Sequence, residues 1–390
     1  MVLGLLVTAG LIQLFVSSRQ TYRMQETSAR LQEDGRFALD NITEATHMAA
    51  YLGCANLYRF GLRTVGGQQV RGPRVIALNA PQFNDSNLLQ AYDHNAGSWT
   101  PNLPPEVINV TLLGGQTLNV ATGTDVLTVT GGSPCITHLA QNMGNRASNL
   151  SLQGNACGYR PNDVLLISDC WSNSDVFRAT DVQVTAAMYQ RPLPGGGFQG
   201  TSIPIFTLQH GFTNLSGGPA NDSNALSVPY KQPVPGAENV AQVMQLRTRT
   251  YFVAPSLNAA GATPAQCRSG QAVCSLWEFD GVNYNELVEG VQDLQLTYGI
   301  GNSYGDENAD LYVTPAAPNF RIANVMNLRI AVLMLSTETG MAASAQPLLA
   351  AGTNFAGVFN PPAGFNPNGR LARVFTTTIN LRNRTLDFAP

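Results

Sequence analysis

The sequence predicts an α+β protein in which one long N-terminal helix packs on a large, elaborated antiparallel β-rich head. Residues 17–52 contain no proline and repeat apolar side chains at helical spacing. From Gly53 onward, short apolar runs with a period of two alternate with segments rich in Gly, Pro and Asn. We therefore expect a membrane and stalk helix over residues 1–52 and a β-rich head over residues 53–390.

The opening segment is apolar from Met1 to Val16, and no charged residue occurs before Arg19. A membrane span needs about 20 apolar residues, so this segment is short for one. A cleavable signal peptide would need a basic start and an A-x-A cleavage site, and neither is present. Two interpretations remain, a buried core helix and a membrane anchor whose beginning is missing. We expect a membrane and assembly helix, formed by Leu3, Gly4, Leu6, Gly10, Leu11, Leu14 and Phe15.

A second apolar face follows the opening segment. Its members recur at steps of four and three, with Leu31 one heptad before the first of the others; they are Leu31, Ala38, Ile42, Ala45, Ala49 and Leu52. The charged residues lie on the other face, and Glu26 and Arg30 have the i,i+4 spacing of a helix-supporting pair. These patterns predict one helix from Leu3 to Leu52, about 75 Å long, that packs on the head through this face.

Several motifs along this helix resemble those of PilW-type minor pilins. They are SSRQTYRMQE, RLQEDGRFAL and MAAYLGC, in this order, and the resemblance continues in DVLLISDC, ELVEGVQDLQLTYGI and VFTTTINLRNRT. The resemblance implies a pilin-like helix and a non-enzymatic component of the type IV pilus, made as a prepilin and active in pilus assembly, cell adhesion and twitching motility. It implies a place in the tip complex that primes fibre growth.

The same resemblance implies the partners and the location. Other minor pilins and the major pilin would contact the chain, the helix would lie in the inner membrane of a Gram-negative bacterium, and the periplasmic head would later reach the pilus tip. Pilins begin with a basic leader and carry a glutamate early in the mature helix. Neither occurs here, so we expect Met1 to fall inside the mature helix. A type II secretion pseudopilin, or a membrane-anchored adhesin or secreted enzyme with a helical stalk, remains an alternative.

The six cysteines favour disulfides in an oxidising compartment, because no C-x-x-C pair suggests a zinc site. Cys267 and Cys274 would close a short loop and are the most plausible single bridge. The pairing of Cys54, Cys135, Cys157 and Cys170 stays open.

Composition and motifs argue against most other functions. The net charge is −3 and the sequence has no basic run, which argues against nucleic-acid binding. A D-x-N-x-D run makes a weak calcium site possible through Asp306, Asn308 and Asp310, although the Gly and Glu of an EF-hand are replaced by Leu311 and Ala317. We expect no other cofactor and no catalytic residue; nothing distinguishes Ser133, His138 and Asp125 as a catalytic set.

The head is expected to contain strands at 107–113, 125–130, 164–168, 176–184, 240–253, 294–300, 328–336 and 374–381. The run LRIAVLML is almost unbroken in its apolar character, so we expect the most buried strand there. Linkers are expected at 91–105, 192–200, 217–235 and 352–369, where Gly, Pro, Asn and Ser are frequent.

Overall fold

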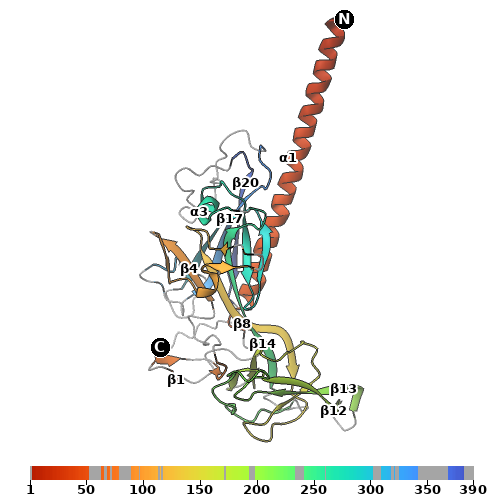
Figure 1. The fold of residues 1–390 in the computed structure, drawn as a ribbon, viewed down its shortest axis with the longest axis vertical. Helices are drawn as coiled ribbons and strands as arrows, with labels where there is room; N and C mark the ends of the chain where they lie inside the picture. Colours follow the sequence, from red (N-terminus) through yellow and green to blue (C-terminus); the bar gives the residue numbers. More distant parts are fainter. Residues whose placement is uncertain are drawn as a thin grey trace.

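The computed structural model describes residues 2–51, 63–65, 68–70, 73–78, 89–95, 97–112, 115, 117–170, 173–192, 198–232, 241–259, 261–301, 309–317, 320, 325–340 and 368–381. Figure 1 shows a long helix that projects from a head built almost wholly of strands. The head has two parts. The upper lobe is the part beside the helix, and the lower lobe is the part farthest from the N-terminus.

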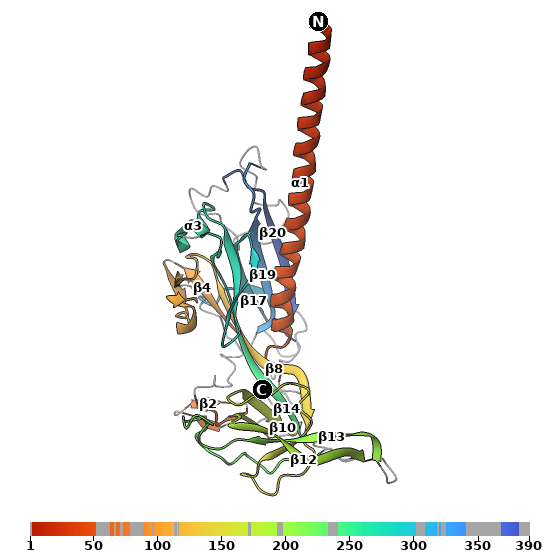
Figure 2. The same cartoon turned by 45° about the vertical axis from the view of Figure 1, so that its right-hand side comes forward.

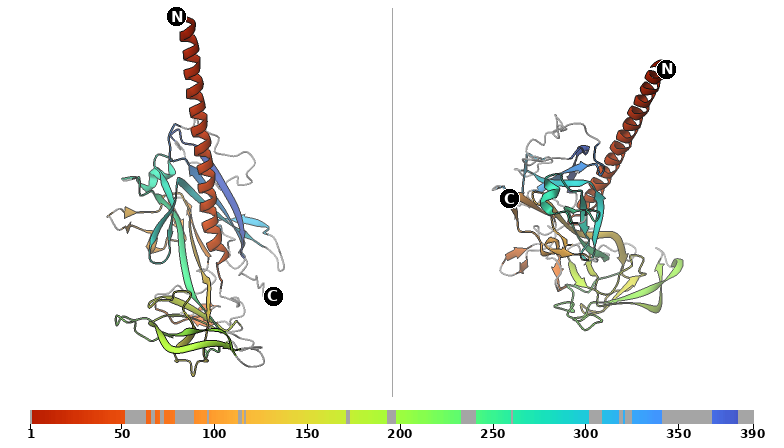
Figure 3. Two further views of the ribbon diagram at one scale, coloured as in Figure 1. Left: turned by 90° about the vertical axis from the view of Figure 1, so that its right-hand side faces the viewer. Right: turned by 45° about the horizontal axis from the view of Figure 1, so that its top comes forward.

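Helix α1 runs from Val2 to His47 without interruption. Its 46 residues correspond to about 69 Å at 1.5 Å per residue. The helix ends five residues before the predicted limit, because the backbone turns at residues 48–50 and Ala50 takes a positive φ of 58°. Leu52 lies outside the described residues. The first half of α1 projects and the second half lies along the upper lobe, as the two views in Figure 3 show.

A four-stranded antiparallel sheet receives the helix. Its order is β18-β17-β19-β20, with bounds Leu311–Val313 (β18), Val291–Ile300 (β17), Val325–Leu335 (β19) and Ala372–Asn380 (β20). Every residue from Ile330 to Leu335 in β19 is buried, which agrees with the apolar run LRIAVLML.

A nine-stranded sheet connects the two lobes. Strands β8 (Val126–His138) and β14 (Gln242–Pro255) pair with each other and run from the upper lobe into the lower one (Figure 2). Beyond β8 lie β4 (Leu89–Asn95) and β5 (Ser98–Thr100). The other edge of β14 pairs in the lower lobe with β10 (Val164–Ser168), which is followed by β11 (Ser174–Arg178) and β3 (Arg74–Val75). In the upper lobe the same edge pairs with β15 (Cys274–Phe279), which is followed by β16 (Tyr284–Glu289). Among the described pairs only β3 and β11 are parallel.

The lower lobe adds a three-stranded sheet of β12 (Asp181–Pro192), β13 (Phe198–Gln209) and β9 (Leu150–Gln153). Its own apolar core includes Leu165, Phe177, Leu208 and Val243. Smaller elements are β1 (Arg63–Val65) with β2 (Gln68–Val70), β6 (Val110–Thr111) with β7 (Thr117–Leu118), the 3-10 turn η2 (Pro105–Val107) and the short helix α3 (Pro264–Arg268).

Several strand and linker predictions differ from the structure. Of the strand expected at 107–113, the described residues contain only β6, which follows the 3-10 turn η2. The strand expected at 176–184 is two strands, because the chain leaves β10 at Ala179 and the Thr180 amide then donates to the carbonyl of Gln209 in β13. The linker expected at 91–105 is wrong over most of its length, since β4 and β5 occupy it. The strand at 164–168 has the predicted bounds.

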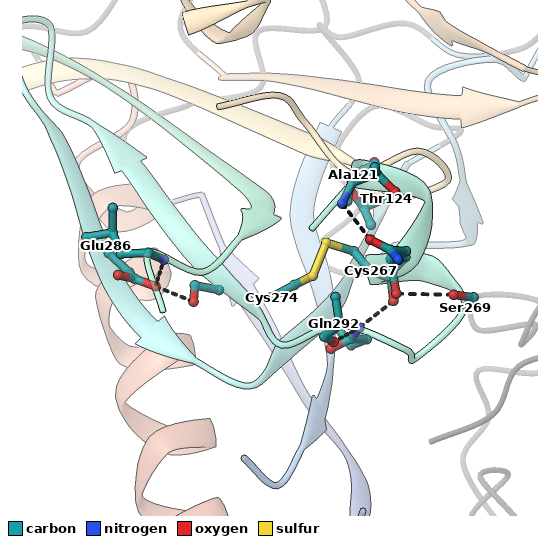
Figure 4. The surroundings of a disulfide bond; sticks show 12 residues. Ala121, Thr124, Cys267, Ser269, Cys274, Glu286 and Gln292 are labelled. Atoms are coloured by element: carbon teal, nitrogen blue, oxygen red, sulfur yellow. Dashed lines mark hydrogen bonds between the residues drawn. A yellow bond between two sulfur atoms is a disulfide. The ribbon is translucent and has the colours of Figure 1, made fainter. Parts of the chain in front are cut away.

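All the cysteines in the described part of the chain are disulfide-bonded. Cys267 and Cys274 form the expected bridge, with a Cα–Cα distance of 5.6 Å, and it ties α3 to β15 (Figure 4). Cys135 and Cys157 form a second bridge with the same Cα–Cα distance. Cys170 is also disulfide-bonded, and Cys54 lies outside the described residues.

Candidate assembly interface

The second half of α1 is part of the core of the head. Leu31, Ala38, Ile42, Ala45 and Ala49 are 0–6% exposed, so the predicted apolar face is buried as far as Ala49. They belong to one apolar cluster with residues of β17, β19 and β16. Burying such a face stabilises the fold by roughly 25 cal/mol for each Å² of apolar surface removed from water.

Small and weakly polar side chains complete this face. Thr27 and Thr46 are buried, and Leu39 is 9% exposed. Gly35 stands one turn after Leu31, where a Cβ would lie only 2.5 Å from the ring of Phe375 in β20. These residues were not predicted, because threonine and glycine look like interruptions of an apolar pattern. The signal that could have found them is spacing alone, since Thr27 and Gly35 flank Leu31 at i−4 and i+4.

The chain after α1 is fixed to β8 by backbone contacts. The Ala50 amide donates to the Thr130 carbonyl at 3.1 Å, and the Gly132 amide donates to the Tyr51 carbonyl at 2.8 Å. At Gly131 a Cβ would come within 1.9 Å of the Met48 carbonyl oxygen. The two glycines of the GGSPC segment thus allow the end of the helix to touch the strand backbone, and this is their role in the structure.

Polar side chains hold the same part of α1 from the side. The Tyr251 hydroxyl lies 3.4 Å from the Asn41 carbonyl oxygen and 3.2 Å from Glu278 Oε1. Glu278 also forms an ion pair with Arg249 at 3.3 Å. Burial raises the pKa of Tyr251, so the phenol stays a neutral hydrogen-bond donor.

The first half of α1 has the opposite character. Every residue from Leu11 to Glu26 is exposed, and the exposed fractions are 62% for Leu11, 71% for Leu14 and 69% for Phe15. Gly10 is exposed with no atom within 4 Å of where a Cβ would lie. Leu3, Gly4 and Leu6 are in the helix, but their side chains lie outside the described part of the structure.

The expected membrane span is not supported. Among the helices of the described residues, none has a segment that is both long enough and apolar enough to cross a membrane.

On the charged face of the helix, Glu26 and Arg30 form the predicted i,i+4 pair, an exposed ion pair of 2.7 Å.

Ser133, His138 and Asp125, which nothing in the sequence distinguishes as a catalytic set, each contact a backbone group. The Cys135 amide donates to Ser133 Oγ, His138 Nδ1 contacts the Ala241 carbonyl, and Asp125 is buried where it accepts from the amide of Leu296. Burial, followed by the nearby Asp93, raises the pKa of Asp125 well above its usual range.

The weak calcium prediction stays untested. Asp306 and Asn308 lie outside the described residues, and the Asp310 amide donates to the Ile300 carbonyl at 3.0 Å. Within the described part of the chain, no three acidic, histidine or cysteine side chains cluster as metal ligands would.

The fold thus defines a β-rich protein whose N-terminal helix packs on the head over its second half and projects, with exposed apolar side chains, over its first half. Residues 250–383 match the family model of PilW, described as type IV pilus-assembly protein W. This match, over about a third of the chain, supports a PilW-type protein with a part in type IV pilus assembly at the cell envelope. No curated protein and no solved structure matches the chain.

The matched region has a clear place in the fold. It begins inside β14 and ends just after β20, so it contains α3 and all the strands from β15 to β20. These include the four-stranded sheet that receives α1. The match therefore falls on the part of the head that holds the projecting helix.

Proposed function

We propose that this chain is a minor pilin, a non-enzymatic component of the tip complex that primes growth of the type IV pilus. One observation carries the proposal, namely that α1 is held firmly by the head over its second half while large apolar side chains project over its first half. Other minor pilins and the major pilin are the proposed partners, and the proposed location of the head is the pilus tip.

The physical argument concerns the exposed apolar surface. Contiguous apolar patches of this kind are rare on monomeric proteins and mark interaction surfaces. Leu11, Ile12, Leu14, Phe15 and Val16 are 47–71% exposed in the isolated chain. Burying each of them against neighbouring helices would contribute about 1.5–3 kcal/mol per side chain. The open space around Gly10 would let another helix approach closely.

In this proposal, the buried second half of α1 determines how the head is oriented in the filament. Because Leu31 to Ala49 are buried in the core of the head, a helix that packs into a filament carries the head with it at a fixed angle. Incorporation of the helix and placement of the head would then be one event.

Leu11→Asp tests the proposal. A carboxylate at a buried helix–helix contact would be desolvated without a partner, so we expect this variant to fold and to be lost from sheared pili. Gln13→Asp is the matched control, since it adds the same charge to the same exposed segment at a polar position. The measurement is the amount of the chain in sheared pili and the number of pili per cell, with each variant as the sole copy.

Normal piliation and normal incorporation of Leu11→Asp would contradict the proposal. Equal loss for both variants would show that charge anywhere in the segment is harmful, and would remove the special role of the apolar side chains.

A further inference from the structure

A pocket of about 480 Å³ lies on the upper lobe beside α3. Its lining includes Asn258, Gln266, Gln271, Thr337, Glu289 and Arg370. Figures 1 and 2 place α3 at the end of the head from which α1 projects. The pocket falls within the region that matches the PilW family, and the assembly role proposed above makes no use of it.

Arg370 is the unusual member of this lining, because it is a buried cation that lacks a matching anion. Its residue is only 7% exposed. The Nη1 atom donates to the Ala272 carbonyl at 3.1 Å, while Nε has no hydrogen-bond partner in the described structure. Neither of the ion pairs found among the described residues involves Arg370. Burial lowers the pKa of its guanidinium, and no neighbouring carboxylate offsets that effect.

Glu289 is the one acidic residue in the lining of this pocket, and it is already engaged through Oε1. Glu289 Oε1 accepts hydrogen bonds from Ser256 Oγ and from Asn258 Nδ2, both at 2.6 Å. The sequence of residues 341–367, which precedes Arg370, contains no Asp and no Glu. A buried ion without a partner costs several kcal/mol, so proteins rarely keep one that has no use.

The guanidinium is held in place by its surroundings. The Ala272 carbonyl that accepts from Arg370 also accepts from Gln292 Nε2 at 2.9 Å, and Gln292 donates as well to the Cys267 carbonyl (Figure 4). The Cys267–Cys274 disulfide fixes this segment to β15. The contact with Ala272 fixes Nη1 of the guanidinium, and no hydrogen bond from Nε or Nη2 is found among the described residues.

We propose that this pocket binds a carboxylate group through Arg370. Two parallel N–H groups of a guanidinium match the two oxygens of a carboxylate, and such a pair is strong where water is excluded. The amides of Gln266 and Gln271 and the hydroxyl of Thr337 surround the pocket with further donors. The carboxylate comes either from a free small acid or from an Asp or Glu side chain of an adjacent pilus subunit. Only the second source rests on the proposed function.

The first experiment tests the chemistry on the full-length chain in detergent, without pili. Thermal unfolding is followed at constant pH and ionic strength while acetate replaces chloride. We expect the wild-type midpoint to rise with the logarithm of acetate concentration, as for any ligand that binds only the native state. Arg370→Met should unfold at a higher temperature than the wild type in chloride and show no response to acetate, because it removes an unpaired charge and the binding group together. Arg160→Met, which removes an exposed arginine from the lower lobe, should respond like the wild type.

The second experiment identifies the source. Lys231 is the only lysine of the chain, so Arg370→Lys adds a single new amine, in the pocket. Carbodiimide treatment of sheared pili couples an amine to a carboxylate in contact with it, and mass spectrometry reads the joined peptides. A cross-link from position 370 to an acidic residue of a second chain would identify a neighbouring subunit as the source. An acetate response without that cross-link would identify a free acid.

Two results would overturn the proposal. One is a wild-type midpoint that ignores acetate together with no intermolecular cross-link at position 370. The other is a cross-link from position 370 to Glu289 alone, since this would give Arg370 an internal partner. The acetate experiment is independent of filament assembly, so its failure is distinguishable from a failure of the proposed pilin role.

Discussion

Gly131 determines how closely α1 and β8 approach each other. An alanine there would place its Cβ 1.9 Å from the carbonyl oxygen of Met48, and both atoms belong to backbone that cannot rotate away. The helix end and the strand would have to separate, and the hydrogen bonds of Ala50 and Gly132 would lengthen with them. A single methyl group thus decides whether the helix reaches its place on the head.

We expect Gly131→Ala to lower the free energy of unfolding by about 1–3 kcal/mol, the usual cost of overpacking a close contact. Gly211→Ala is the matched control, because the nearest atom to its Cβ would be at an ordinary distance of 3.8 Å. Urea unfolding followed by circular dichroism measures both. Equal stability of the two variants would show that the contact at Gly131 relaxes without cost.

Asp293, in β17, predicts a pH dependence. Burial raises the pKa of this carboxyl to about 7, although a hydrogen bond from Gln295 at 2.9 Å lowers it. The native state therefore keeps the proton between the ordinary value near 3.8 and pH 7, while the unfolded state loses it. Since the native state binds more protons in this window, the stability contributed by Asp293 falls as the pH rises from about 4 to 7.

Asp293→Asn should remove this component. Between pH 4.5 and pH 7.5, the unfolding free energy of the variant should therefore fall less, or rise more, than that of the wild type. Asp280→Asn is a control of opposite sign, because partial burial of Asp280 is outweighed by the amides of Asn283 and Val282, which lower its pKa. Urea titrations of the wild type and both variants at the two pH values measure these unfolding free energies. An unchanged pH profile for Asp293→Asn would mean that this carboxyl ionises normally in the native state.

At the scale of elements, helix α1 could be predicted well because its signal is local. Steps of three and four among apolar residues place Leu31, Ala38 and Ile42 on one face whatever they touch. The strand at 164–168 has the same advantage, since a short apolar run between turn residues is also a local pattern.

The remainder depends on which segments meet, and one sequence does not report that. Gly35 is required by the ring of Phe375, which lies 340 residues further along the chain. The division between β11 and β12 is set by the carbonyl of Gln209, a partner from another hairpin. Arg370 appears in the sequence as an ordinary arginine in a Gly- and Asn-rich segment, and only its burial identifies it.

For the whole molecule, the two halves of α1 predict different effects on stability when the chain is truncated at two different places. The side chains of residues 8 and 10–26 are exposed, and Thr27 is the first buried residue among the described side chains of the helix. We expect removal of residues 1–26 to leave the thermal midpoint of the head unchanged. Removal of residues 1–47 should lower it strongly or prevent folding, because it takes Leu31, Ala38 and Ile42 out of the core.

Differential scanning calorimetry of the two truncated chains checks this expectation. A head that unfolds at the same temperature without residues 1–47 would show that the helix is an accessory to the fold and would weaken the link between helix incorporation and head placement.

Helix α1 lies lengthwise beside β19 and β20 instead of meeting them end on (Figures 2 and 3). Tension applied along its axis would act on the contact in shear. All the buried side chains between Thr27 and Ala49 would then resist at the same moment, whereas a sideways pull would separate them one after another. The orientation that packs the helix would therefore make the joint mechanically strongest along the helix axis, the direction of pull expected if the chain joins a fibre as proposed.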